Sequence, residues 1–162
     1  MSTAATGPAV PDPLHASAVA LGERGLLILG PSGAGKTRLA LELVALGAEL
    51  VADDRVIVEG HEGQLCMRPA PALAGLVEIR GAGVLRHPHR AEAPLWLAVD
   101  LGRAAAERMA GAAQIRIART ELPCLAGRPP MHAAALLAML RTGALPEADL
   151  AIAPAARDYR HG

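Results

Sequence analysis

Aromatic residues are almost missing from this sequence, which limits both its core and its possible ligands. Among 162 residues there is no Phe, one Trp (Trp96) and one Tyr (Tyr159), yet 52% of the residues are hydrophobic. Leu, Val, Ile and Ala must therefore fill the core. Single-stranded nucleic-acid binders stack bases on aromatic side chains, so the scarcity of such side chains argues against that class. The length fits one domain of ordinary size.

Net charge, long apolar runs and a signal peptide are missing as well. Sixteen basic and sixteen acidic residues cancel, so there is no basic excess of the kind that binds nucleic acid. No apolar run reaches the 18 residues of a membrane-spanning helix, and the N-terminus lacks a basic region followed by an apolar stretch. The two cysteines, Cys66 and Cys124, lack metal-ligand spacing. We therefore expect a cytoplasmic protein with two reduced thiols and neither a nucleic-acid nor a membrane partner.

Hydrophobic periodicity predicts more strands than helices. Two helices are clear, at residues 36–46 and 131–143, because each has an apolar stripe and a glycine at its end. A shorter helix is expected at residues 102–111 and a Gly/Pro loop at 123–130. Strands are expected at residues 19–21, 25–30, 48–52 and 93–101, in a hairpin over 55–68, in a bent segment over 75–85, and from residue 113 into the loop.

Hairpins together with a strand–helix–strand unit predict an α/β fold with a mixed sheet, and not a fully parallel one. Residues 1–13 and 144–162 are rich in Ala and Pro. We expect them to be a flexible N-terminal tail and a largely irregular C-terminal tail on either side of a catalytic domain at residues 14–143.

The strongest motif is a phosphate-binding loop that follows a strand and opens a helix. The segment Gly30-Pro31-Ser32-Gly33-Ala34-Gly35-Lys36-Thr37 fits G-x-x-x-x-G-K-[ST] at every fixed position. The glycines let backbone N–H groups turn inward around phosphates, and the helix N-terminus adds partial positive charge. Lys36 is expected to bind the β- and γ-phosphates of a nucleotide, and Thr37 to bind Mg²⁺.

Asp53 and Asp54 follow Lys36 by 17 and 18 residues. A helix and a return strand fit this interval, so the pair is expected to lie beside the loop. A carboxylate there can hold Mg²⁺ or orient an attacking group. Neighbouring strand residues point to opposite faces, so the two carboxylates can have different roles. The pattern alone leaves a kinase and an ATPase equally open.

Residues 15–60, together with Glu78-Ile-Arg-Gly-Ala-Gly83 and the segment Pro123–Arg128, resemble the catalytic domain of bacterial HPr kinase/phosphorylase. The resemblance extends from His15 to about Arg141. It implies a P-loop kinase domain of the HPr kinase and PEP carboxykinase-like type. It further implies ATP and Mg²⁺ as cofactors, and the phosphocarrier protein HPr as the partner whose serine is phosphorylated and dephosphorylated.

The resemblance also assigns roles residue by residue. Asp54 matches the aspartate that acts as base in phosphorylation and as acid in the reverse reaction, and His15 matches an active-site histidine. Asp53 is expected near the metal, and Glu78 matches a Mg²⁺-binding glutamate. Arg80 is given no catalytic role, because orienting the turn after Glu78 explains it equally well.

Arginines complete the implied site. Arg108 is the candidate for the family's active-site arginine, with Arg103 as the alternative, and either would neutralise charge on the transferring phosphoryl group. Arg128 matches a region linked to dephosphorylation.

The chain departs from the family pattern at both ends. Family members have a further N-terminal domain and longer C-terminal helices, which this sequence lacks, so we expect a minimal branch of the family. A homo-oligomer and the phosphorylase activity stay open. Two further functions also stay open: a small-molecule kinase, and a nucleotide-dependent binding module without turnover.

Overall fold

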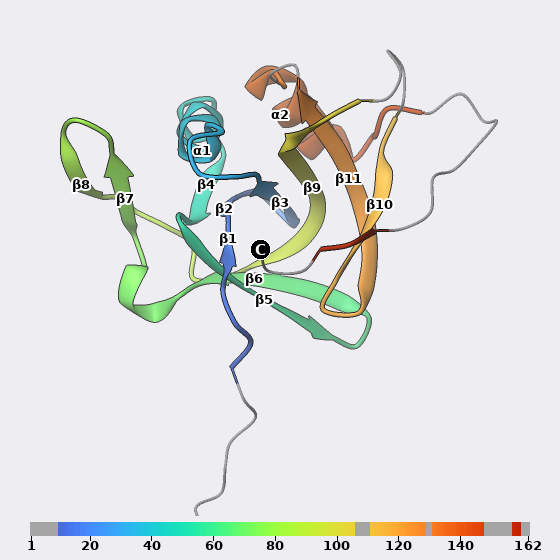
Figure 1. Ribbon diagram of the computed structural model, residues 1–162, viewed down its shortest axis with the longest axis horizontal. Helices are drawn as coiled ribbons and strands as arrows, with labels where there is room; N and C mark the ends of the chain where they lie inside the picture. The colour runs from blue at the N-terminus through green and yellow to red at the C-terminus, as the bar shows by residue number, and fades with distance from the viewer. Residues whose placement is uncertain (1–9, 106–110, 129–130, 148–156, 160–162) are drawn as a thin grey trace, which may run out of the picture.

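The computed structural model describes residues 10–105, 111–128, 131–147 and 157–159 of the chain (Figure 1). Its first half contains β1 (Leu14–His15), β2 (Ser17–Leu21), β3 (Arg24–Leu29), α1 (Lys36–Ala45), β4 (Glu49–Ala52), β5 (Arg55–His61), β6 (Gln64–Pro69), the short 3₁₀ helix η1 (Pro71–Leu73), β7 (Leu76–Ile79) and β8 (Gly83–Arg86). Its second half contains β9 (Ala93–Ala104), β10 (Ala113–Ile117), β11 (Thr120–Arg128), α2 (Ala133–Thr142) and β12 (Arg157–Asp158).

A ten-stranded mixed sheet forms the body of the molecule, which confirms the predicted α/β class with a mixed sheet. Its central strands β3, β9 and β11 are parallel neighbours, while β2–β3, β5–β6 and β10–β11 are antiparallel hairpins. Carboxyl ends of parallel strands meet at one edge of a sheet, so the loops after β3, β9 and β11 share one edge. The phosphate-binding loop follows β3 and thus lies at this edge.

Both faces of the central strands are buried, each in its own cluster. In β3, Leu26 and Ile28 pack with α1 and α2, whereas Leu27 and Leu29 face the cluster formed with β5, β6 and β10. This alternation is the two-residue period of a strand, and burial on both faces explains why β3 reads as a continuous apolar run. The two helices lie side by side over one face of the sheet (Figure 1).

The two helices end close to where the sequence predicts. The last helical residue of α1 is Ala45, and Gly47 follows with φ +112°. The C-terminal cap of α2 is Gly143 at φ +72°. Glycine adopts this left-handed backbone without strain, so the sequence signal for both helix ends is confirmed.

Two local predictions are wrong. Residues 102–104 belong to strand β9 and not to a helix, while residues 106–110 of that predicted helix lie outside the described part of the chain. Residues 123–128 belong to β11 and not to a loop. Pro123 is tolerated in this inner strand because pairing with β9 begins one residue later, at Cys124, so the missing N–H breaks no bond on that side.

Strands β7 and β8 form a separate two-stranded sheet that stands clear of the main sheet, beside α1 (Figure 1). The sequence predicts this segment as extended with glycines at its bend, and the structure confirms it. In the C-terminal stretch, β12 pairs in parallel with β10, so this stretch is not wholly irregular. Within the described residues, no helix is long and apolar enough to cross a membrane.

Candidate active site

The phosphate-binding loop has the backbone that its glycines permit. Gly33 and Gly35 have φ angles of +81° and +98°, and the N–H of Ala34 donates to the Pro31 carbonyl at 3.1 Å. Left-handed backbone at these two positions would strain a residue with a side chain. Helix α1 begins directly after Gly35. The free N–H groups of its first turn and the positive end of its dipole therefore face the loop, where they can bind an anion.

Lys36 is buried at the base of this loop. Its Nζ donates to the carbonyl oxygens of Gly30 at 2.8 Å and Pro31 at 3.0 Å. Burial lowers the pKa of Lys36 below its usual value, and the carboxylates of Asp54 and Asp53 partly oppose that shift. A bound phosphate would restore the missing counter-charge, which is the physical reason for a lysine in this place.

Asp53 directly follows the return strand β4 and is only 4% exposed. Its Oδ1 accepts two hydrogen bonds, from Ser17 Oγ at 2.7 Å and from Thr37 Oγ1 at 2.9 Å. Two hydroxyl donors compensate part of the cost of burying a carboxylate. The prediction that Asp53 lies beside the loop is therefore confirmed, with Ser17 as an unforeseen partner.

Asp54 turns away from its neighbour and meets His15. The distance from His15 Nε2 to Asp54 Oδ1 is 3.1 Å, and 55% of the Asp54 side chain is exposed. Pairing of β1 with β5, together with the bond from the Ala16 N–H to the Asp54 carbonyl, fixes this arrangement. Asp54 has φ +66°, a left-handed backbone that Asp and Asn tolerate better than other residues with side chains and that is often found at functional sites.

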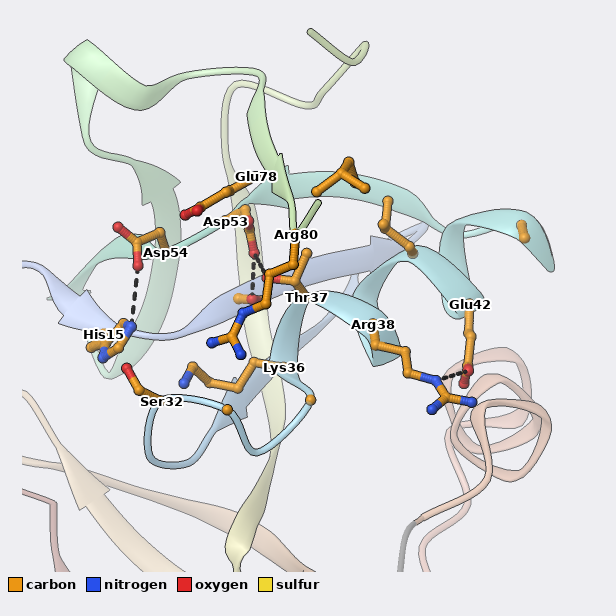
Figure 2. Close-up of a pocket in the computed structure, with 16 residues that line it drawn as sticks. His15, Ser32, Lys36, Thr37, Arg38, Glu42, Asp53, Asp54, Glu78 and Arg80 are labelled. Atoms are coloured by element: carbon orange, nitrogen blue, oxygen red, sulfur yellow. Dashed lines mark hydrogen bonds and ion pairs between the residues drawn. The ribbon is translucent and has the colours of Figure 1, made fainter. Parts of the chain in front are cut away.

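These groups line one pocket of about 620 Å³ (Figure 2). The loop and α1 form one wall, the ends of β1, β2 and β4 form the floor, and the β7–β8 hairpin forms the opposite wall. The lining residues are His15, Ser17, Ser32, Gly33, Gly35, Lys36, Thr37, Arg38, Leu41, Glu42, Ala45, Asp53, Asp54, Glu78, Ile79 and Arg80.

The hairpin contributes Glu78 and Arg80 to the pocket. In Figure 2 the Glu78 carboxylate points toward Asp54, and the Arg80 guanidinium points toward Lys36. The positive charge of Arg80 is close enough to lower the pKa of Lys36 further. Glu78 thus lines the pocket, and its role as a Mg²⁺ ligand stays a prediction. Arg80, which was given no catalytic role, also lines the pocket.

The chemistry of the side chains fits Mg²⁺. Among the described residues, no three His, Cys, Asp or Glu side chains are close enough to hold a metal ion alone. Mg²⁺ in nucleotide sites is usually held by one or two carboxylates, substrate phosphates and water. The Thr37–Asp53 pair matches the threonine and aspartate that hold it in phosphate-loop enzymes.

The predicted arginines lie elsewhere or outside the described chain. Arg108 falls in residues 106–110, which the structure does not describe. Arg103 lies one residue before the end of β9, and Arg128 is the last residue of the parallel strand β11. Both are on the same sheet edge as the loop, but neither lines the pocket. Ser17 could have been noticed as a hydroxyl in an otherwise apolar strand. Arg80 stands in the same Glu78–Gly83 motif that carries the resemblance, and its place two residues after Glu78 could have marked it as part of the site.

The arrangement has clear relatives among known proteins. Residues 9–89, half of the chain, match the family model described as the HPr Serine kinase C-terminal domain. HPr kinase/phosphorylase of Streptococcus thermophilus is 49% identical over 73 residues, and that of Clostridium beijerinckii is 42% identical over 72 residues. Each match covers 44% of this chain and 24% of the relative, so the matched region spans about a quarter of those proteins.

The fold has a counterpart among solved structures. The Hpr(Ser) kinase/phosphatase from Coxiella burnetii superposes with a TM-score of 0.70 at 22% identity, over 82% of this chain and 95% of the other. The matched sequence contains the phosphate-binding loop, the Asp53–Asp54 pair and the Glu78–Arg80 wall of the pocket. The chain therefore belongs to the HPr serine kinase C-terminal domain family.

Proposed function

We propose that this chain is an ATP- and Mg²⁺-dependent serine kinase that phosphorylates the phosphocarrier protein HPr and regulates a bacterial phosphotransferase system in the cytoplasm. The observation that carries the proposal is the position of Asp54. Its carboxylate lies in the same pocket as the phosphate-binding loop, contacts His15 at 3.1 Å and is 55% exposed. A protein serine can reach an exposed carboxylate, whereas a small-molecule kinase would favour an enclosed acceptor site.

Each step of phosphate transfer has a residue in this pocket. The loop N–H groups, the N-terminus of α1 and Lys36 bind the phosphates and hold the γ-phosphorus near Asp54. Thr37 and Asp53, with Glu78 on the facing wall, would hold Mg²⁺, which would neutralise negative charge on the phosphates. Asp54 accepts the proton of the attacking serine, and His15, whose Nε2 lies 3.1 Å from Asp54 Oδ1, orients its carboxylate.

The variant Asp54→Asn tests the proposal with little change in shape. Asparagine also tolerates the left-handed backbone of this position, so the variant removes the charge without adding strain. We expect phosphorylation of purified HPr to fall about 100- to 10,000-fold in kcat, the usual contribution of a general base. Binding of Mg·ATP should stay within about threefold of wild type, since the Asp54 carboxylate is not assigned a phosphate contact.

Asp12→Asn is the matched control, because Asp12 is exposed and lies outside this pocket. It should transfer phosphate at the wild-type rate. A wild-type protein that binds Mg·ATP but transfers no labelled phosphate to HPr would refute the proposed function. Normal transfer by Asp54→Asn would refute the assignment of the base and leave the kinase activity standing. Running the assay from phosphorylated HPr with excess inorganic phosphate measures the reverse reaction, in which Asp54 returns the proton.

A further inference from the structure

Arg80 lines the pocket with a positive charge that has no hydrogen-bond or ion-pair partner among the described residues. Among the described residues, three Arg or Lys side chains line the pocket: Lys36, Arg38 and Arg80. Arg38 is paired with Glu42 at 3.0 Å on the exposed face of α1. Lys36 is held by loop carbonyls. Within the described part of the chain, Arg80 makes no hydrogen bond or ion pair, although its guanidinium has five donors.

The backbone of the hairpin directs Arg80 into the pocket. Glu78 is the third residue of β7, and Arg80 follows the end of that strand, just before Gly81 at φ +80°. Residues two apart in a strand project to the same side, so one wall presents a carboxylate and a guanidinium together. Figure 2 shows the two side chains diverging, with Glu78 toward Asp54 and Arg80 toward Lys36. No ion pair joins them.

The charge of the pocket calls for a second cation near the phosphates. In the part of the chain that the structure describes, Asp53, Asp54 and Glu78 bring three carboxylates to the pocket, against Lys36 and Arg80 once the Arg38–Glu42 pair is set aside. A nucleotide adds further negative charge, which moves onto the equatorial oxygens of the phosphoryl group during transfer. A planar guanidinium matches two such oxygens at once, and an ammonium cannot.

We propose that Arg80 is a catalytic residue that binds the transferring phosphoryl group together with Lys36. This rests on the proposed function of the pocket. In the transfer, the bond between the γ-phosphorus and the β–γ bridging oxygen breaks, and ADP leaves with its electron pair. A bond forms between phosphorus and the serine oxygen, whose proton passes to Asp54. The phosphoryl oxygens accept hydrogen bonds from Arg80 while this exchange takes place.

The test compares Arg80→Gln with Arg86→Gln. Both arginines belong to the same hairpin segment, but Arg86 is exposed and lies outside the pocket. We expect Arg80→Gln to lower kcat for HPr phosphorylation about 100- to 1,000-fold, the usual loss for one electrostatic donor, with KM for ATP changed less than threefold. Arg86→Gln should keep the wild-type kcat, and Arg80→Lys should recover only a minor part of the loss.

A second measurement does not depend on the acceptor protein. ADP with Mg²⁺ and aluminium fluoride imitates the transferring phosphoryl group, and titration calorimetry compares its affinity with that of Mg·ADP alone. Arg80→Gln should lose most of the extra affinity that fluoride confers on the wild type, and Arg86→Gln should keep it. Mg·ADP alone should bind both variants as it binds the wild type.

The outcomes separate the two proposals. Unchanged kcat and unchanged fluoride complex in Arg80→Gln would overturn the role of Arg80, as would a higher KM for HPr at unchanged kcat. Absence of transfer by the wild type would overturn the proposed function, while the fluoride titration would still decide on Arg80. A wild type to which fluoride adds no affinity would also overturn the role of Arg80.

Discussion

The buried contact between Ser17 and Asp53 gives the sharpest quantitative prediction. Ser17 is 1% exposed, and its Oγ donates to Asp53 Oδ1 at 2.7 Å. Ser17→Ala removes this donor and leaves Asp53, itself 4% exposed, with Thr37 as its remaining hydroxyl donor. A hydrogen bond to a charged group contributes about 1.5–3 kcal/mol, so we expect the free energy of unfolding to fall by about 2 kcal/mol. In a chain of this size, that lowers Tm by about 4–8 °C.

Urea unfolding followed by circular dichroism measures this loss, provided that the m-value stays constant. The same substitution made together with Asp53→Ala isolates the contact. Without the carboxylate, Ser17→Ala should change the unfolding free energy by less than about 0.5 kcal/mol, because its hydroxyl has no charged acceptor to lose. Ser32→Ala, at an exposed loop position, should likewise change it by less than about 0.5 kcal/mol.

A coupling energy between Ser17 and Asp53 below about 0.5 kcal/mol would refute this reasoning. It would mean that the buried carboxylate is satisfied by Thr37 alone, or that it is solvated in the folded protein. In the first case, the hydrogen bond of 2.7 Å from Ser17 Oγ to Asp53 Oδ1 would contribute nothing measurable to stability.

Two further predictions concern the sheet. Burial raises the pKa of Cys124 from 9.0 to about 12. Between pH 9 and pH 12 the thiol of the unfolded chain loses its proton, while the thiol of the folded protein keeps it. The stability that this thiol contributes is therefore fully present below pH 9 and is lost as the pH rises toward 12. The unfolding free energy should therefore fall by up to about 1.4 kcal/mol per pH unit above pH 9, and less steeply in Cys124→Ala; equal slopes would contradict this. Gly25→Ala places a methyl group against the Pro94 carbonyl and the Met67 side chain, so unfolding in urea should show a loss of about 1–3 kcal/mol. In Gly60→Ala the added methyl group meets its nearest atom at 3.5 Å, so the loss of unfolding free energy should be less than half as large. Equal losses in the two variants would show that Pro94 and Met67 move aside to accommodate the methyl group at Gly25.

Local features of the site could be predicted from the sequence, whereas long-range features could not. The loop, the start of α1 at Lys36 and the return of β4 to Asp53 are one continuous strand–helix–strand unit. Their order follows from hydrophobic period and glycine positions, so sequence reasoning found them. Glu78 lies 42 residues after Lys36 on another hairpin, and its place was foreseen only through the family resemblance.

The wrong assignments have a shared physical cause. Residues 102–104 and 123–128 contain Gly, Pro and Ala, which taken alone favour turns or a short helix. In the structure β9 and β11 are parallel neighbours through this stretch, up to the pairing of Ala104 with Arg128. Backbone hydrogen bonds between distant segments outweigh a weak local preference, and no window of sequence contains both partners.

By itself, the sequence determined a phosphate-binding loop, a mixed α/β fold and an acidic pair placed to serve that loop. Those features depend on residues near one another in the chain. Only the tertiary structure decided which partner each carboxylate takes, with Ser17 and Thr37 on Asp53 and His15 on Asp54. It also brought Arg80 to the phosphate loop, because the position of the β7–β8 hairpin against α1 is set by packing and not by local preference.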